Sequence, residues 1–260
     1  MLGAVIGDIA GSRFEFDNYR HTDFDIFSPD SDFTDDTICT VAIADWVLQG
    51  CSDNLASILQ GWCRAYPCPK GAYGGRFSQW IEWKDPEPYN SWGNGSAMRV
   101  SAVGWAFATL EETLHFAEQS AIVTHNHPEG IKGAQAVAAA IFWARTGMEK
   151  AQIKENITRQ FGYDLSQSCD QIRPHYHFNE SCQETVPQAI TAFLESDDFE
   201  HAIRLAVSLG GDSDTLAAIT GSIAEAYHGI PTAMREHALA ILPHRIAETL
   251  LTFESQYQAV

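Results

Sequence analysis

The segment FTDDT, residues 33–37, concentrates side chains that could do chemistry. It sets Asp35 and Asp36 between two threonines, directly ahead of the apolar run ICTVAIADWVL. Helix capping alone could explain this arrangement. A Thr N-cap followed by acids satisfies free N–H groups and suits the positive end of the helix dipole.

The arrangement occurs a second time in GGDSDT, residues 210–215. Here Asp212, Asp214 and Thr215 stand just before another apolar helical run. Capping would have to be invoked twice, which weakens it as the only explanation. The residues could also cap the helices and have a second role at once. We therefore expect the two segments to share a further function.

Carboxylates and hydroxyls are hard oxygen ligands, which suit Mg²⁺, Mn²⁺ or Ca²⁺ better than Zn²⁺ or copper. The chain has 34 acidic against 16 basic residues, so crowding more carboxylates together is unfavourable unless a cation lies between them. Two such helix ends facing each other could bridge two ions about 3.5–4 Å apart. The sequence thus predicts a site for hard divalent cations.

Three weaker signals lie elsewhere. GDIAGSRFEF, residues 7–16, carries Asp8 and, beyond an expected helix end, Glu15. Taken alone, Asp8 is interpreted as a hydrogen-bonded acid and Glu15 as an exposed one. GNGSAMR, residues 93–99, could offer N–H groups to a phosphate, although a turn is the simpler interpretation. THNHP, residues 124–128, spaces two histidines poorly for joint ligation, which favours capping or hydrogen bonding.

The elements that must position these groups are helical. Apolar residues recur at helical spacing along most of the chain, whereas no comparable stretch alternates with period two. Gly50 and Gly229 are expected to end the helices that follow the two acidic segments. Two segments, residues 85–95 and 163–184, resist helix assignment, and such polar and aromatic loops are candidate binding walls. The fold class is predicted to be all-α.

Composition narrows the classes of function that the protein could have. With 260 residues, 45% of them apolar, the chain can bury one large core, and no linker is visible, so we treat residues 1–260 as a single compact domain. The net charge of −18 argues against binding nucleic acid or anionic membranes. No signal peptide or membrane-spanning run is visible, which predicts a soluble, cytoplasmic protein. The six cysteines form no CxxC pair and are expected to be reduced thiols.

Five segments, in order over roughly residues 1–235, carry a family resemblance: GDIAGSRFE, FTDDT, GNGSAMR, the histidine of THNHP, and GGDSDT. Together they resemble the ADP-ribosylglycohydrolase family, which includes the dinitrogenase reductase-activating glycohydrolases. The resemblance implies an all-α domain that binds two Mg²⁺ or Mn²⁺ ions. It also implies hydrolysis of the bond between ADP-ribose and an acceptor, in an ADP-ribosylated protein or a small-molecule conjugate.

Matching positions carry the family's residue roles onto this chain. The implied metal ligands are Thr34, Asp35, Asp36, Asp212, Asp214 and Thr215. Glu15 is implied to lie beside the metals as catalytic acid/base or as a gate, and Asp35 is assigned to the catalytic group with it. The implied substrate-binding residues are Asn94, Gly95 and Ser96, with Gly74, Gly75 and His125 as looser matches. Residues 163–184 match nothing in the family, so the acceptor stays open.

Two alternatives remain. One is a catalytically silent ADP-ribose-binding protein, which would not need a proton-transfer group such as Glu15. The other is a metal-dependent nucleotide phosphohydrolase, but the sequence has neither an adjacent His-Asp pair nor a GxxxxGK[ST] loop. In the favoured mechanism the two ions orient the ribose hydroxyls and polarise a water that attacks the anomeric carbon.

Overall fold

A computed structural model describes residues 1–258, which form fifteen helices and no strand. The helices are α1 Leu2–Gly11, α2 Asp35–Leu48, α3 Leu55–Ala65, α4 Gly75–Glu82, α5 Gly95–Met98, α6 Ser101–Ala106, α7 Leu110–Ile122, α8 Pro128–Arg145, α9 Lys150–Phe161, α10 Cys169–Ile172, α11 Cys182–Glu195, α12 Phe199–Ser208, α13 Ser213–His228, α14 Thr232–Ile241 and α15 His244–Tyr257. The all-α prediction is confirmed.

The expected helix ends are found close to where the sequence places them. Gly50 follows α2 with a positive φ of 80°, and Gly229 caps α13 with a φ of 74°. The nonperiodic segment 163–184 contains one element that periodicity missed, the single-turn α10, as well as the start of α11. One turn is too short to show an apolar repeat, which explains the omission.

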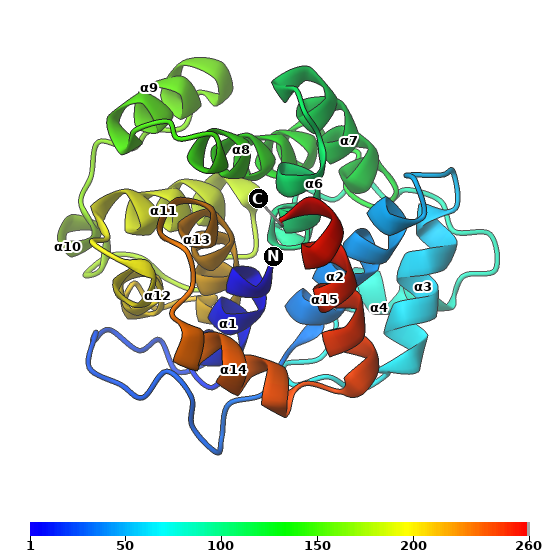
Figure 1. The fold of residues 1–260 in the computed structure, drawn as a ribbon, viewed down its shortest axis with the longest axis horizontal. Helices are drawn as coiled ribbons and strands as arrows, with labels where there is room; N and C mark the ends of the chain where they lie inside the picture. The colour runs from blue at the N-terminus through cyan, green and yellow to red at the C-terminus, as the bar shows by residue number, and fades with distance from the viewer. Residues whose placement is uncertain (259–260) are drawn as a thin grey trace.

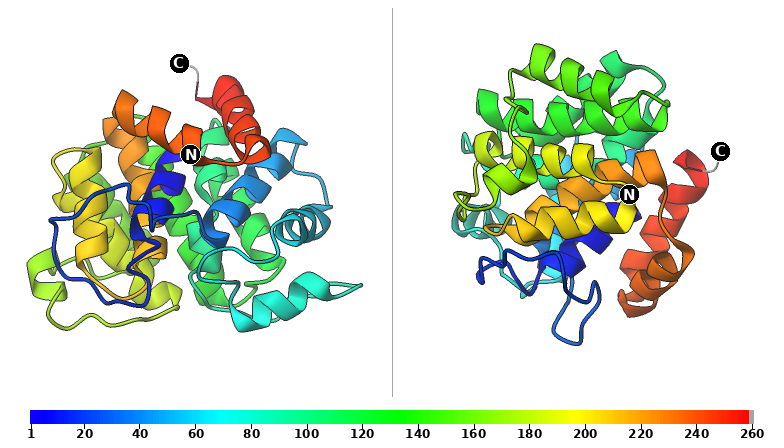
Figure 2. Two further views of the ribbon diagram at one scale, coloured as in Figure 1. Left: turned by 90° about the horizontal axis from the view of Figure 1, so that it is seen from below. Right: turned by 90° about the vertical axis from the view of Figure 1, so that its left-hand side faces the viewer.

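The helix α13 is the centre of the molecule. It packs against α1, α8, α11 and α12, and every residue from 213 to 224 is buried. Figure 1 shows α1 beside α13, with α2, α3 and α15 on one side and α11 and α12 on the other. In both views of Figure 2 the C-terminal helices α14 and α15 lie along the outside. Among the described residues, no helix combines the length and apolar character needed to cross a membrane, and all six cysteines are free thiols.

Glycines let α1 and α13 touch through their backbones. Gly3, Gly7 and Gly11 recur every four residues and therefore share one face of α1. A Cβ added to Gly7 would lie 2.0 Å from the carbonyl oxygen of Ala217, and one on Gly11 would lie 2.5 Å from the Cα of Asp214. Only glycine fits at such separations. The C-terminal end of α1 is thereby held against the N-terminal end of α13.

A buried carboxylate holds α2 against the same helix. Asp8 lies inside α1, is fully buried, and accepts four hydrogen bonds from the backbone and hydroxyl groups of Thr34 and Thr37, at 2.5 to 3.1 Å. The expectation that Asp8 is a hydrogen-bonded acid is confirmed. These bonds tie FTDDT to α1, which itself packs on α13. Both acidic segments are thus brought to one end of the α1–α13 pair.

Replacing Gly7 with Ala tests this contact. The added methyl would collide with the Ala217 carbonyl, so the helices must separate, at a cost of about 1–3 kcal/mol that exceeds the gain of up to about 1 kcal/mol in helix propensity. Gly61→Ala is the control, because nothing lies within 4 Å of its added methyl. We expect chemical unfolding to show a lower midpoint for Gly7→Ala only. Equal midpoints for Gly7→Ala and wild type would show that the contact tolerates a side chain.

Candidate active site

A cavity of about 530 Å³ opens where the helix ends meet, a size common for small-molecule sites. Its wall combines the N-termini of α2, α4 and α13 with the segments around α1, α5 and α11. The lining residues are Glu15, Phe16, Asp35, Asp36, Gly71, Ala72, Tyr73, Gly74, Gly75, Arg76, Phe77, Tyr89, Ser91, Gly93, Asn94, Gly95, Met98, Arg99, His125, Phe178, Glu180, Asp212, Asp214 and Thr215. Both acidic segments therefore face one space.

Three carboxylates form the tightest acidic group. Glu15, Asp212 and Asp214 each offer an oxygen, and these oxygens lie within 4.8 Å of one another. Asp35 and Asp36 line the same cavity but are not members of this group. The donor set is entirely oxygen, which is what Mg²⁺, Mn²⁺ and Ca²⁺ prefer.

Several of these oxygens lack a partner. Asp36 Oδ2, Asp214 Oδ1 and Glu15 Oε2 are inaccessible to solvent and accept no hydrogen bond from the described residues. An unpaired buried carboxylate costs several kcal/mol, and the N-terminal dipoles of α2 and α13 offset only part of that cost. A hard divalent cation fits this arrangement, because it would supply both the missing charge and the missing partner.

Burial and mutual repulsion shift the acids' proton affinities. Burial, followed by the charge of Asp214, raises the pKa of Asp36 well above its ordinary value. Burial and the charge of Asp212 do the same for the pKa of Asp214. Burial raises the pKa of Asp212 to about 6, and burial together with nearby acids raises the pKa of Glu15 to about 8. Without a counter-ion, the cluster holds protons near neutral pH.

Most of the sequence-predicted residues converge on the cavity. It is lined by Glu15, Asp35, Asp36, Gly74, Gly75, Asn94, Gly95, His125, Asp212, Asp214 and Thr215. Thr34 and Ser96 do not line it. The Thr34 hydroxyl donates to Asp8 and accepts the Asp36 N–H, and the fully buried Ser96 hydroxyl donates to the Gly130 carbonyl at 2.7 Å.

The capping hypothesis for FTDDT is thus right for Thr34, whose hydroxyl is the N-cap of α2. The side-chain oxygens of the two aspartates are not used in that cap. Asp212 occupies the N-cap position of α13 but makes no side-chain cap bond, and its Oδ2 instead accepts the amide of Asn94 at 2.6 Å. Capping therefore leaves the aspartate side chains available for another role.

The two histidines of THNHP have separate surroundings. His127 caps α8 by accepting the N–H of Glu129 at 3.1 Å, as the capping interpretation predicts. His125 is buried on the cavity wall, with its Nδ1 2.7 Å from the Thr124 hydroxyl. Burial and the charge of Arg99 lower the pKa of His125 well below its usual value. A neutral imidazole therefore faces the cavity.

Sequence reasoning missed several residues of the wall. Arg99 is fully buried and donates to the Ser120 carbonyl and the Thr124 hydroxyl, so it supports the His125 side of the cavity. Phe16, Phe178 and Glu180 were not singled out either. Phe178 and Glu180 could have been found from their position in the nonperiodic segment 163–184, which was predicted to be a candidate binding wall.

Comparison with known proteins identifies the family. A family model described as ADP-ribosylglycohydrolase matches residues 1–257. The chain belongs to this family. The resemblance inferred from the five segments is confirmed, and the ADP-ribosylglycohydrolase fold accounts for the helical arrangement around the cavity.

Individual relatives agree with the assignment. The chain is 27% identical to ADP-ribosylarginine hydrolase Tri1 of Pseudomonas putida (strain GB-1), over 88% of this chain and 70% of the relative. It is 24% identical to ADP-ribosylhydrolase ARH3 of Xenopus tropicalis, over 88% and 86%. A solved structure titled ADP-ribosylglycohydrolase-related protein complex has the same fold, with a TM-score of 0.73, 24% identity and coverage of 98% and 95%.

The raised pKa values generate a prediction about pH and metal. A carboxyl whose pKa is raised in the folded state destabilises the fold as it loses its proton, so the metal-free protein should lose stability between about pH 4 and pH 8. Mg²⁺ binds deprotonated carboxylates, so it should raise the melting temperature more at pH 8 than at pH 5. Asp214→Asn should reduce both effects. The same metal-induced shift at both pH values would contradict this account.

Asp36→Asn separates capping from ligation. The Thr34 hydroxyl bonds the backbone N–H of residue 36, so the variant keeps the cap. Removing a buried, unpaired charge should leave metal-free stability equal or higher, while metal affinity collapses. Thermal melts with and without Mg²⁺ measure both quantities. A variant that is less stable without metal, yet still responds normally to Mg²⁺, would mean that this carboxylate serves the helix and not a cation.

Proposed function

We propose that this protein hydrolyses the bond between ADP-ribose and an acceptor, using two hard divalent cations, Mg²⁺ or Mn²⁺. The observation that carries the proposal is the convergence of Glu15, Asp35, Asp36, Asp212 and Asp214 on one cavity of an ADP-ribosylglycohydrolase fold. The names of the two relatives, an ADP-ribosylarginine hydrolase and an ADP-ribosylhydrolase, support the reaction class.

A second part of the cavity wall suits a diphosphate. Gly74 and Gly75 begin α4, whose first N–H groups have no partner within the helix and suit an anion. Arg76 follows them and also lines the cavity. These groups explain how a protein with a net charge of −18 could bind a diphosphate. The neutral His125 and the close-packed Gly95 complete this side, where a larger residue than glycine would press on the imidazole ring.

The residues that would hold the cations are Asp35, Asp36, Asp212, Asp214 and Thr215, together with Thr34 by family match. When bound, the cations would supply the positive charge that lowers the pKa of water and offsets charge on the ribose oxygens. Asn94 fixes the orientation of Asp212 through its amide, so it acts as a positioning residue.

Glu15 is suited to move the proton. It lies partly buried beside Asp212 and Asp214, and a carboxylate in this position can accept a proton and return it. The water oxygen forms a bond to the anomeric carbon as the bond to the acceptor breaks, and that electron pair leaves with the acceptor atom. Glu15 takes the proton lost by the water and returns it to the acceptor atom. The products are ADP-ribose and the unmodified acceptor.

One panel tests the reaction against its alternatives. ADP-ribosyl-arginine, ADP-ribosyl-serine and O-acetyl-ADP-ribose are incubated with the protein and Mg²⁺ or Mn²⁺, before and after chelation. We expect cation-dependent release of free ADP-ribose that chelation abolishes. Release of AMP and ribose phosphate would indicate a phosphohydrolase, and tight binding of ADP-ribose without turnover would indicate a silent binder.

Glu15→Gln keeps the size of the side chain but removes the group that accepts a proton. We expect kcat to fall on the order of 10²–10⁴-fold while the thermal melt stays cooperative. Glu236→Gln, an exposed acid on α14 outside the cavity wall, is the matched control and should keep full activity. Unchanged kcat in Glu15→Gln would remove Glu15 from the reaction.

A further inference from the structure

Three hydrogen-bonded side chains join two of the weaker sequence signals, GNGSAMR and THNHP, at the cavity wall. Arg99 ends the first segment, and Thr124 and His125 begin the second. All three are buried, with exposed fractions of 1%, 0% and 5%. The Arg99 guanidinium lies 2.8 Å from the Thr124 hydroxyl, which lies 2.7 Å from Nδ1 of His125. The proposed hydrolysis assigns no role to Arg99 or Thr124.

The chemistry of the three groups fixes the direction of these hydrogen bonds. A guanidinium can only donate, and Arg99 donates to the Thr124 hydroxyl and, at 2.9 Å, to the Ser120 carbonyl. A hydroxyl has a single proton to give. Among residues 1–258 the Thr124 hydroxyl bonds only Arg99 and His125. Because Arg99 cannot accept this proton, Thr124 donates it to Nδ1 of His125.

The opposite direction would leave a buried proton without an acceptor. If Nδ1 carried the imidazole proton, the Thr124 hydroxyl would accept from both neighbours, and its own proton would be unbonded at a fully buried position. Burial and the charge of Arg99, which lower the pKa of His125, also disfavour a doubly protonated ring. His125 is therefore neutral, with its proton on Nε2.

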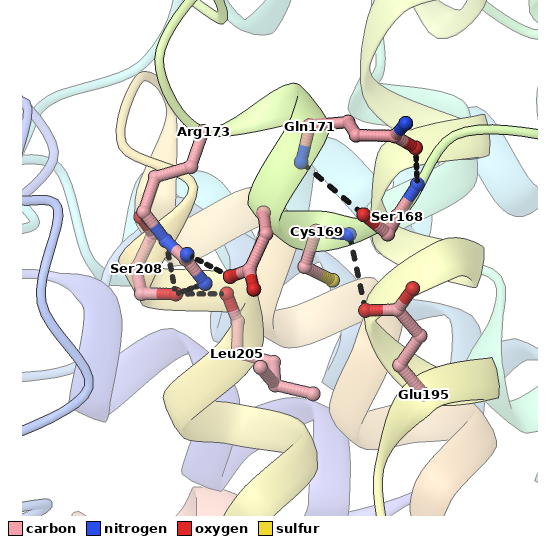
Figure 3. Close-up of polar contacts among 8 residues, drawn as sticks. Ser168, Cys169, Gln171, Arg173, Glu195, Leu205 and Ser208 are labelled. Carbon is pink, nitrogen blue, oxygen red and sulfur yellow. Dashed lines mark hydrogen bonds and ion pairs between the residues drawn. The ribbon is translucent and has the colours of Figure 1, made fainter.

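A second set of side chains, outside the proposed active site, has the same order of donors. Figure 3 shows the Arg173 guanidinium bonded to the Ser208 hydroxyl, at 3.0 Å, and this hydroxyl donating to the Leu205 carbonyl at 2.8 Å. A carbonyl can only accept, so the Ser208 proton must point away from the arginine. His125 offers an imidazole nitrogen where Leu205 offers a carbonyl oxygen.

The Nε2 edge of the imidazole lies beside the glycines of GNGSAMR. A Cβ added to Gly95 would lie 3.2 Å from Nε2, and one added to Gly93 would lie 3.5 Å from it. Both glycines line the cavity together with His125. Among the described residues no group forms a hydrogen bond with Nε2. An N–H donor that has no protein partner is thus held at the cavity wall.

We propose that Arg99 and Thr124 are positioning residues, which fix His125 as a neutral Nε2–H donor to an oxygen of bound ADP-ribose. This inference rests on the proposed function, which puts ADP-ribose in the cavity. The family match implies only that His125 contacts the substrate, whereas the hydrogen bonds specify the atom and the proton that make the contact. Phosphate oxygens are acceptors, so a fixed donor suits them. A ring with its proton already in place needs no proton uptake when the ligand binds.

Nuclear magnetic resonance of protein with isotopically labelled histidine observes the tautomer directly. The signal of His125 is the one missing from His125→Gln. We expect wild type at neutral pH to carry the proton on Nε2, and the Nε2 resonance to shift when ADP-ribose and Mg²⁺ are added. Thr124→Val removes the hydroxyl at nearly equal size, so Nδ1 should carry the proton in part of the molecules. Thr124→Ser keeps the hydroxyl and should keep the wild-type tautomer.

Calorimetry of ADP-ribose binding in the presence of Mg²⁺ measures what the fixed donor contributes. Thr124→Val should weaken binding about three- to tenfold, the effect of losing one neutral hydrogen bond, and should raise KM more than it lowers kcat. Thr124→Ser should bind like wild type. Ser208→Ala is the matched control, because it removes a buried hydroxyl bonded by an arginine outside the cavity wall, and it should also bind like wild type. Thermal melts verify that every variant is folded.

The possible outcomes separate this inference from the proposed function. A wild-type protein that binds ADP-ribose with the His125 proton on Nδ1 would overturn the inference alone, and this spectrum decides even where Thr124→Val does not fold. Unchanged binding by Thr124→Val, or equal weakening by Thr124→Ser or Ser208→Ala, would overturn it as well. If wild type binds no ADP-ribose and cleaves no ADP-ribosyl substrate with Mg²⁺ or Mn²⁺, the hydrolase function fails, and the ligand role of His125 fails with it.

Discussion

The backbone contact between α1 and α13 is the constraint on which the site depends. Three glycines on one face of α1 leave no Cβ where the two backbones approach most closely, so the end of α1 meets the start of α13. Asp8 then ties the start of α2 to α1. The N-termini of α2 and α13, far apart in sequence, are thereby fixed at one cavity. Neither helix end could be displaced without separating the carboxylates.

The acids of this region divide into two kinds according to their partners. Asp8 is fully buried, yet its oxygens accept four hydrogen bonds, so they have partners within the protein and tie α2 to α1. Asp36 and Asp214 are equally buried but keep oxygens without partners. Leaving such groups unpaired costs free energy that a purely structural site would avoid. The same low-dielectric surroundings that make the cluster unfavourable alone would make its attraction for a cation strong.

Different parts of the cavity wall also carry different charge. Gly74, Gly75 and Arg76 line it with the start of α4 and a cationic side chain, while four aspartates line it at the starts of α2 and α13. Phe16, Phe178 and Glu180 also line it, with two stacked aromatic rings and an exposed carboxylate. The acids come from segments that resemble the family, and Gly74 and Gly75 are looser matches, whereas Phe178 and Glu180 come from the unmatched segment 163–184.

The sequence alone determined the helical fold class, the family and the two acidic segments, because helical periodicity and short motifs are local properties of the chain. Only the tertiary structure showed which groups bond Asp8 and that Thr34 and Ser96 do not line the cavity, because their hydroxyls donate to Asp8 and to the Gly130 carbonyl. It also revealed the pairing of Phe16 with Phe178. These features depend on contacts between residues distant in sequence. A side chain's partners are decided by how helices pack, and no local pattern records that packing.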